Sequence, residues 1–152
     1  MRIFSGRRRF AAVAVTAAVA GLAGGLVVAH EDSSSALAQG PPRVIAQGKF
    51  RSLTWNTLGT ASLVRESSGN LQLHLSHDFF TKHAPELYVY LVKLRGQQRI
   101  FWKEVGLLKG SEGGQAYSVG SDATKPGVQV AIFCAKCNQI SGLAPLAPVP
   151  SA

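Results

Sequence analysis

The sequence predicts an all-β domain, an antiparallel β-sandwich or small barrel of about seven to eight short strands, preceded by an N-terminal signal or anchor segment. Three observations lead to this fold class. Short segments rich in β-branched and aromatic residues alternate with turns, one segment alternates cleanly between polar and apolar residues, and no segment has a convincing helical period. A chain of 152 residues is long enough for one such domain with terminal extensions.

Residues 1–38 have the composition of an export signal. Four arginines precede an uncharged apolar run at 11–29, and small residues at 36–38 predict cleavage before Gln39. Residues 6–10 (Gly-Arg-Arg-Arg-Phe) resemble a twin-arginine motif, while arginines before an apolar run also serve the general secretory route. The apolar run is also long enough to stay in the membrane as an anchor. We therefore expect a periplasmic or extracellular protein, either released by cleavage or held by this segment.

The chain is basic, with a formal net charge of +8. Cleavage before Gln39 would lower this charge to +6, because residues 1–38 contain four of the 16 basic and two of the eight acidic residues. A basic surface attracts anionic lipid, polysaccharide or acidic proteins, but here the basic residues are scattered, as on an ordinary solvated surface. No basic helix or aromatic-rich motif predicts nucleic-acid binding, and we expect membrane contact only through the N-terminal segment if it is uncleaved.

The expected globular part spans residues 48–146. Residues 39–47 are predicted to be a linker and residues 147–152 a proline-rich tail without regular structure. A domain of this size can bury a core without disulfides, so the two cysteines are not needed for folding.

The expected strands follow one another at short spacing. Segment 71–76 alternates most clearly, with Leu71, Leu73 and Leu75 facing inward and the polar residues between them facing outward. The other expected strands are 49–55, 59–65, 86–92, 99–105, 115–119 and 128–134.

The last expected strand leads into the only two cysteines, Cys134 and Cys137. In an extended strand, Val128, Val130, Ile132 and Cys134 share one face. An uninterrupted strand would hold the two cysteine Cα atoms about 10 Å apart, which is too far for a disulfide, so a bridge requires the strand to end or bulge at Cys134.

Three interpretations of this Cys-x-x-Cys pair remain open. The cysteines are buried and inert, or they ligate a metal, or they form a redox pair. In the redox interpretation Cys134 is the principal reactive residue, Cys137 is its resolving partner, and the positive charge of Lys136 favours a thiolate.

Three histidines, His74, His77 and His83, are weak candidates for a copper or zinc site together with a cysteine thiolate. Ordinary surface histidines are the alternative, because no pair has a tight ligand spacing. The sequence contains no glycine-rich phosphate-binding pattern and no convincing nucleophile set for a hydrolase. We therefore predict a non-enzymatic module that carries, at most, a redox-active thiol.

A series of short motifs covers nearly the whole expected domain. These are 48–50 (Gly-Lys-Phe), 59–61 (Gly-Thr-Ala), 84–91 (Ala-Pro-Glu-Leu-Tyr-Val-Tyr-Leu), 105–110 (Val-Gly-Leu-Leu-Lys-Gly), 114–117 (Gly-Gln-Ala-Tyr), 130–134 (Val-Ala-Ile-Phe-Cys) and 142–146 (Gly-Leu-Ala-Pro-Leu). In their order and spacing they resemble the electron-transfer DM-thirteen domain family, a small exported β module.

This resemblance implies a non-catalytic β-sandwich-like fold in which the nearly invariant family cysteine matches Cys134. A redox or electron-relay role has been proposed for that cysteine, and relatives occur beside cytochrome-type domains, so the expected partner is a redox protein or a cytochrome-type domain. The chain departs from the family pattern at Phe133, where tryptophan is common, at Cys137 and Ser141, where aromatics are common, and at Trp55, near a position often held by histidine. The second cysteine makes a local dithiol possible.

Overall fold

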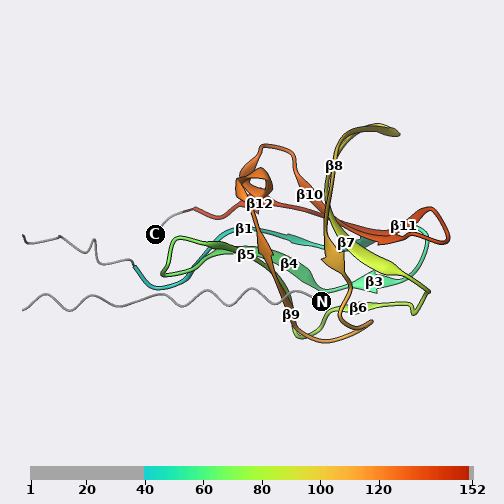
Figure 1. Cartoon of the computed structure of the whole chain (residues 1–152), viewed down its shortest axis with the longest axis horizontal. Coiled ribbons are helices and arrows are strands. Elements are labelled where there is room, and N and C mark those ends of the chain that lie inside the picture. Colours follow the sequence, from blue (N-terminus) through green and yellow to red (C-terminus); the bar gives the residue numbers. More distant parts are fainter. Residues whose placement is uncertain (1–39, 151–152) are drawn as a thin grey trace, which may run out of the picture. The chain divides into compact units, whose positions relative to one another are not determined.

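The structure, a computed structural model, describes residues 40–150 (Figure 1). The expected export signal at 1–38 lies outside these residues. The described part of the chain is all-β, as predicted, with antiparallel strand pairing and a single 3-10 helix, η1 (Ser121–Thr124). Among these residues, no helix has the length and apolar character needed to span a bilayer.

Two five-stranded sheets form the sandwich, and a two-stranded sheet of β3 (Thr57–Leu58) and β6 (Phe80–Thr81) accompanies them. In spatial order, the first sheet contains β12 (Ala147–Pro148), β1 (Arg43–Lys49), β4 (Thr60–Arg65), β5 (Leu71–Leu75) and β9 (Gln115–Val119). The second contains β2 (Arg51–Ser52), β11 (Gln139–Pro145), β10 (Gln129–Cys134), β7 (Leu87–Arg95) and β8 (Gln98–Leu107). The β7–β8 hairpin projects from the rest of the domain (Figure 1).

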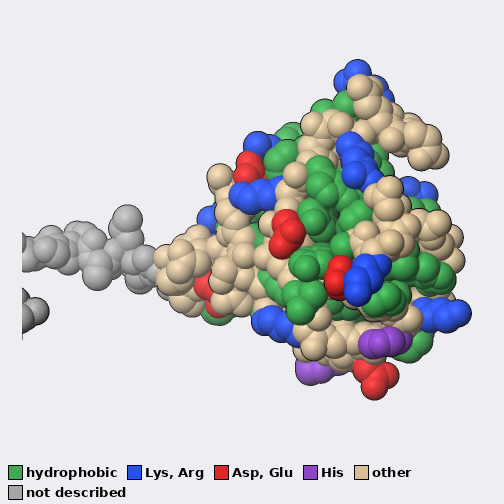
Figure 2. Space-filling model, turned by 45° about the vertical axis from the view of Figure 1, so that its right-hand side comes forward, with side chains coloured by type: hydrophobic (Ala, Val, Ile, Leu, Met, Phe, Trp, Pro, Cys, Tyr) green, Lys and Arg blue, Asp and Glu red, His purple; other side chains and the backbone are tan. Residues whose placement is uncertain are grey.

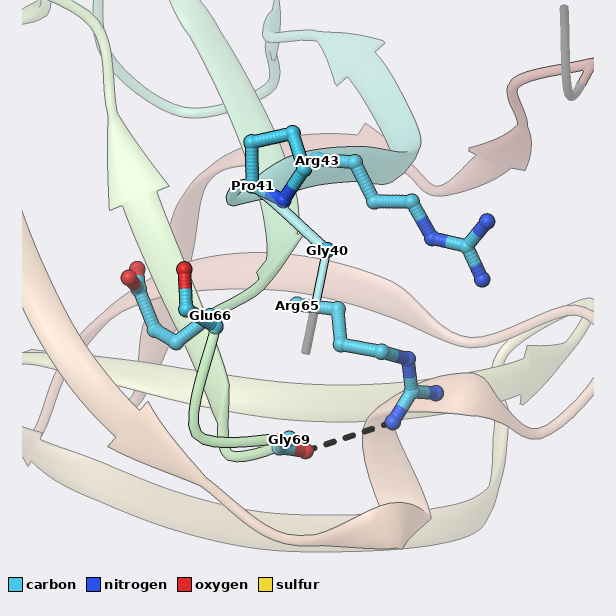
Figure 3. A pocket seen from close by; sticks show the side chains of 7 residues that line it. Gly40, Pro41, Arg43, Arg65, Glu66 and Gly69 are labelled. Carbon is cyan, nitrogen blue, oxygen red and sulfur yellow. Dashed lines mark hydrogen bonds between the residues drawn. The ribbon is translucent and has the colours of Figure 1, made fainter. Parts of the chain in front are cut away.

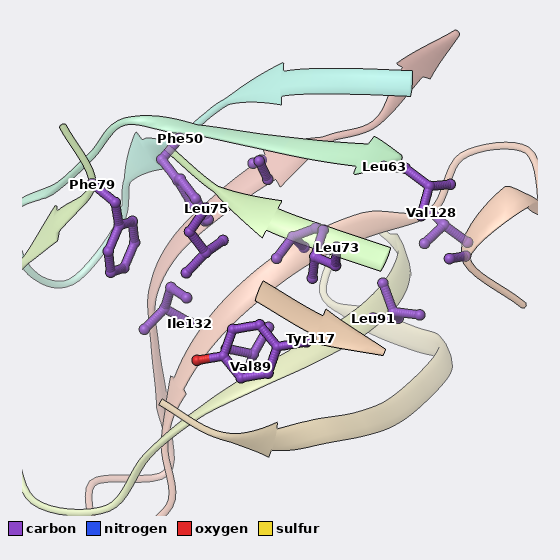
Figure 4. Packing of buried hydrophobic residues seen from close by; sticks show 14 of the residues in the cluster. Phe50, Leu63, Leu73, Leu75, Phe79, Val89, Leu91, Tyr117, Val128 and Ile132 are labelled. Atoms are coloured by element: carbon purple, nitrogen blue, oxygen red, sulfur yellow. The ribbon is translucent and has the colours of Figure 1, made fainter. Parts of the chain in front are cut away.

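The core lies between the inner faces of the two large sheets, where apolar side chains approach one another (Figure 4). The alternation in β5 is confirmed, since Leu73 and Leu75 are buried. The face predicted for β10 is confirmed too, because Val130, Ile132 and Cys134 all belong to this core. The opposite face of β10 is also buried, through Ala131 and other residues of a second apolar cluster. β10 therefore has both faces covered and is a central strand of its sheet.

The N-terminal boundary of the domain differs from the prediction. Residues 43–47 were expected to be part of a linker, but β1 begins at Arg43 and pairs with β4. A bulge between Val44 and Ala46 breaks the alternation of side chains, which conceals this strand in the sequence. The expected strand at 49–55 is correspondingly wrong after Ser52, because residues 53–55 form a bend.

The C-terminal boundary differs as well. Ala147 and Pro148, expected in an irregular tail, form β12 and pair with β1. Proline is tolerated there because β12 is an edge strand, which needs hydrogen bonds on one side only. The N–H of Val149 then donates to the carbonyl of Ile45 at 3.0 Å. The C-terminal segment is thus hydrogen-bonded to the first sheet as far as residue 149.

Candidate functional site: the Cys134–Cys137 turn

The two cysteines lie in the turn between β10 and β11. β10 ends at Cys134, which pairs with Leu87 of β7 and Gln139 of β11. Residues 135–138 then reverse the chain, with Asn138 in the left-handed region at φ 51°. This reversal brings the Cα atoms of Cys134 and Cys137 to 5.2 Å, and their sulfurs form a disulfide. The condition derived from the sequence, that the strand must end or bulge at Cys134, is met because β10 ends there.

The two sulfur-bearing residues differ in exposure. Cys134 is fully buried in the core, whereas Cys137 is only partly buried. The backbone N–H of Cys137 donates a hydrogen bond to Cys134 Sγ at 3.0 Å. The same sulfur lies 3.4 Å from the carbonyl oxygen of Pro85, which can accept a hydrogen bond from Cys134 when that residue is a thiol. A molecule approaching from solvent therefore meets Cys137 first.

The loop before β7 packs directly against this turn. The N–H of Ala135 donates to the carbonyl of Glu86 at 3.0 Å, and Lys136 Nζ lies 3.2 Å from Glu86 Oε1. Glu86 has a φ of 54°, a left-handed conformation that side-chain-bearing residues rarely adopt and that occurs preferentially at functional sites. The ammonium of Lys136, predicted from the sequence to tune a thiolate, is thus paired with a carboxylate of the neighbouring loop.

A groove opens beside the turn. It has a volume of about 310 Å³ and includes Pro85 and Glu86, the residues that touch Cys134 and Lys136. Leu107, at the end of edge strand β8, also lines this groove and is 58% exposed. The loop that contacts the cysteine turn therefore lines a groove with both apolar and charged side chains. Figure 2 shows such mixing on one face of the domain, where lysines and arginines are spread among hydrophobic side chains.

The three candidate histidines do not join the cysteines. His74 lies on β5, where its ring nitrogen Nε2 is 3.0 Å from Gln72 Oε1. His77 is exposed in the following loop and packs near Gly114, and His83 lines the groove described above. In residues 40–150, no group of three or more His, Cys, Asp or Glu side chains is placed to hold a metal ion.

A buried set of hydroxyls lies one strand away and was not predicted. The side-chain oxygens of Thr57, Thr81 and Ser141 lie 2.7 to 3.1 Å from one another, and all three residues are fully buried. This hydroxyl triad joins β3, β6 and β11, and so fixes the strand that follows the cysteine turn. Three isolated Ser and Thr residues carry no sequence signal that they meet, because 84 residues separate the outermost two.

Pro85 and Glu86 were also not predicted as neighbours of the disulfide. They belong to the segment 84–91 that carries part of the family resemblance, but the contact with Cys134 depends on the pairing of β7 with β10.

No family model matches the chain, and neither the curated proteins nor the solved structures contain a significant match to it. Membership of the DM-thirteen family remains a prediction from the short motifs.

Proposed function

We propose that the domain is an exported accessory redox module whose Cys134–Cys137 disulfide accepts two electrons from a partner. The proposal rests on the different exposure of the two cysteines. Cys134 is buried in the core, whereas Cys137 is partly exposed in the turn. An exposed sulfur can be attacked, and a buried one can leave without being attacked itself.

The exchange would proceed in two steps. A thiolate of the partner attacks Cys137 Sγ, the bond between the two domain sulfurs breaks, and Cys134 leaves with the electron pair and takes up a proton. The partner's second thiolate then attacks the partner's own sulfur in the mixed disulfide and releases Cys137, which also takes up a proton. The partner dithiol is oxidised to a disulfide, and the domain disulfide is reduced to a dithiol.

Neighbouring groups would assist the leaving sulfur. The N–H of Cys137 already donates to Cys134 Sγ, a contact that stabilises negative charge as it develops on that sulfur. The carbonyl of Pro85 can then accept the S–H once the sulfur is protonated, so reduction leaves no buried polar group unpaired. In this proposal Cys137 receives the attack and Cys134 is the leaving group, whereas the sequence led us to expect Cys134 as the principal reactive residue and Cys137 as its resolving partner.

A purely structural role for the bridge has weaker support. In the chain-entropy model, a disulfide that closes a four-residue loop stabilises a fold by only about 2 kcal/mol, the low end of the usual range. The domain also has an extensive apolar core, most of which is formed by residues other than the two cysteines. A short bridge in a well-packed domain is more consistent with a reversible redox couple than with a structural disulfide that stabilises the fold.

The proposal also covers the location of the domain and its partner. An export signal at 1–38 would deliver the domain to the periplasm or the cell exterior, where disulfides persist. The resemblance to DM-thirteen domains supports a redox protein or a cytochrome-type domain as the partner.

The test is a redox titration of the folded protein. The chain is equilibrated with glutathione or dithiothreitol buffers of defined potential, free thiols are alkylated, and the oxidised fraction is read by intact mass, with denatured protein as the control. A midpoint between about −270 and −120 mV, the range of exchange proteins, supports the proposal. A midpoint below about −300 mV indicates an inert structural disulfide and contradicts it.

A further inference from the structure

A pair of arginines lies at one end of the sandwich. In the sequence, both arginines are far from the cysteine turn. Arg43 at the start of β1 and Arg65 at the end of β4 are direct cross-strand partners. Arg65 shares its strand face with Leu63, which is fully buried, so the pair lies where the inner face of the first sheet reaches the end of the sandwich. Like charges at directly opposite positions destabilise a sheet, so this pairing calls for a compensating group.

The Glu66 carboxylate lines one cavity beside the pair but forms no ion pair with either arginine. None of the ion pairs within residues 40–150 includes Arg43 or Arg65. Figure 3 shows both arginine side chains extending to the same side, while Glu66 points to the opposite side. The Glu66 carboxylate lies 3.9 Å from His74 Nε2 instead. One hydrogen bond, from Arg65 Nη1 to the carbonyl of Gly69 at 3.3 Å, holds the Arg65 guanidinium in this orientation.

Two open cavities adjoin the arginine pair, and both arginines line both of them. The first has a volume of about 530 Å³ and includes Gly40 and Pro41, the first described residues of the chain. The second has a volume of about 480 Å³ and includes Val44, which is 41% exposed, and Val149. The site thus combines two guanidinium groups with exposed apolar side chains.

We propose that Arg43 and Arg65 bind the phosphate of an anionic phospholipid headgroup. Guanidinium groups match phosphate oxygens through paired, charge-assisted hydrogen bonds, and a bound anion removes the repulsion between the two arginines. Exposed Val44 beside them provides an apolar contact for the glycerol and upper acyl region of a lipid, which a free phosphate lacks.

The chain outside the structure also favours a lipid as the source of the phosphate. The apolar run at 11–29 is separated from Gly40 by ten residues, and a fully extended segment of this length spans at most about 36 Å. Gly40 lines the arginine cavity, so the chain leaves the domain at the proposed site. Binding there would hold this end of the domain against the membrane in which the run is inserted during export, or in which it remains.

The test uses soluble lipids, so that insertion of the apolar run does not contribute. Protein produced from the full-length gene is titrated with dihexanoyl-phosphatidylglycerol below its micelle concentration, with dihexanoyl-phosphatidylcholine, and with inorganic phosphate. Backbone amide shifts of Val44 and Glu66 report binding. Arg43→Gln/Arg65→Gln is compared with Arg51→Gln/Arg95→Gln, which removes the same charge at two exposed positions elsewhere in the sheets.

We expect the phosphatidylglycerol to bind at least tenfold more tightly than the other two ligands, with binding weakened at least tenfold in Arg43→Gln/Arg65→Gln and unchanged in the control pair. Equal weakening in both variants would show a general charge effect and overturn the site. Binding of inorganic phosphate as tightly as the lipid would overturn the assignment to a lipid, and the absence of shifts at Val44 and Glu66 would overturn the proposal as a whole.

Discussion

Reduction of the Cys134–Cys137 bridge is predicted to weaken the fold by a small, calculable amount. The bridge closes a loop of four residues, because the cysteines are three positions apart. In the chain-entropy model this loop contributes about 2 kcal/mol at 25 °C, whereas a 100-residue loop would contribute about 4.7 kcal/mol. By a thermodynamic cycle, the same 2 kcal/mol makes the disulfide of the folded domain harder to reduce than that of the unfolded chain by about 40 mV.

Urea unfolding with and without a reductant measures this difference. With a slope of about 2 kcal/mol per molar urea, the unfolding midpoint should fall by about 1 M on reduction, while the slope stays unchanged. The Cys134→Ala/Cys137→Ala variant is the control, because the reductant should not change its midpoint. Unfolding by the reductant alone, or a loss of more than about 4 kcal/mol in the free energy of unfolding, would show that the fold depends on the bridge and refute the reasoning.

Three further predictions concern stability. Thr57→Val removes one member of the hydroxyl triad, so the free energy of unfolding in urea should fall by about 1 kcal/mol, and an unchanged value would show that the triad contributes nothing. Gly142→Ala would place a Cβ 2.6 Å from Thr57 Cβ, so we expect a loss of about 1–3 kcal/mol in the same assay; wild-type stability would mean that β11 shifts freely. Hydrogen bonds from Lys103 and Lys125 lower the pKa of Asp122 from 3.8 to about 2, which gives stability that is present above pH 3.8 and lost as the pH falls towards 2. The unfolding temperature of Asp122→Asn should therefore fall less than that of the wild type over this pH interval, and parallel curves would contradict the assignment.

Much of the fold follows from local patterns in the sequence. The strands with clear alternation or β-branched runs, such as β5, β7 and β10, are present where they were predicted. β1 was not predicted, because its bulge disrupts the period of two. β12 was not predicted either, because a proline-rich edge strand has the composition of an irregular C-terminal tail. β11 was hidden as well, since its Ser141 and Gly142 are small residues that bury well but carry little strand propensity.

The candidate site could be predicted only in part, because some of its features are local in the sequence and others depend on long-range packing. The spacing of the two cysteines set a geometric condition on the turn, and local geometry of this kind can be derived from the sequence. The exposure of each sulfur cannot, because it depends on the loop at 84–86 and on its packing against residues 135–137. The ion pair between Glu86 and Lys136 likewise joins residues that are fifty positions apart.

The central claim is that Cys137 is the sulfur open to attack and Cys134 the buried leaving group. Single-cysteine variants test it directly, by intact-mass measurement of the mixed disulfide that each folded variant forms with oxidised glutathione. Cys134→Ala, which keeps Cys137, should form the adduct at least tenfold faster than Cys137→Ala, and both should react at similar rates once denatured. Equal rates in the folded state, or faster reaction of the variant that keeps Cys134, would contradict the account.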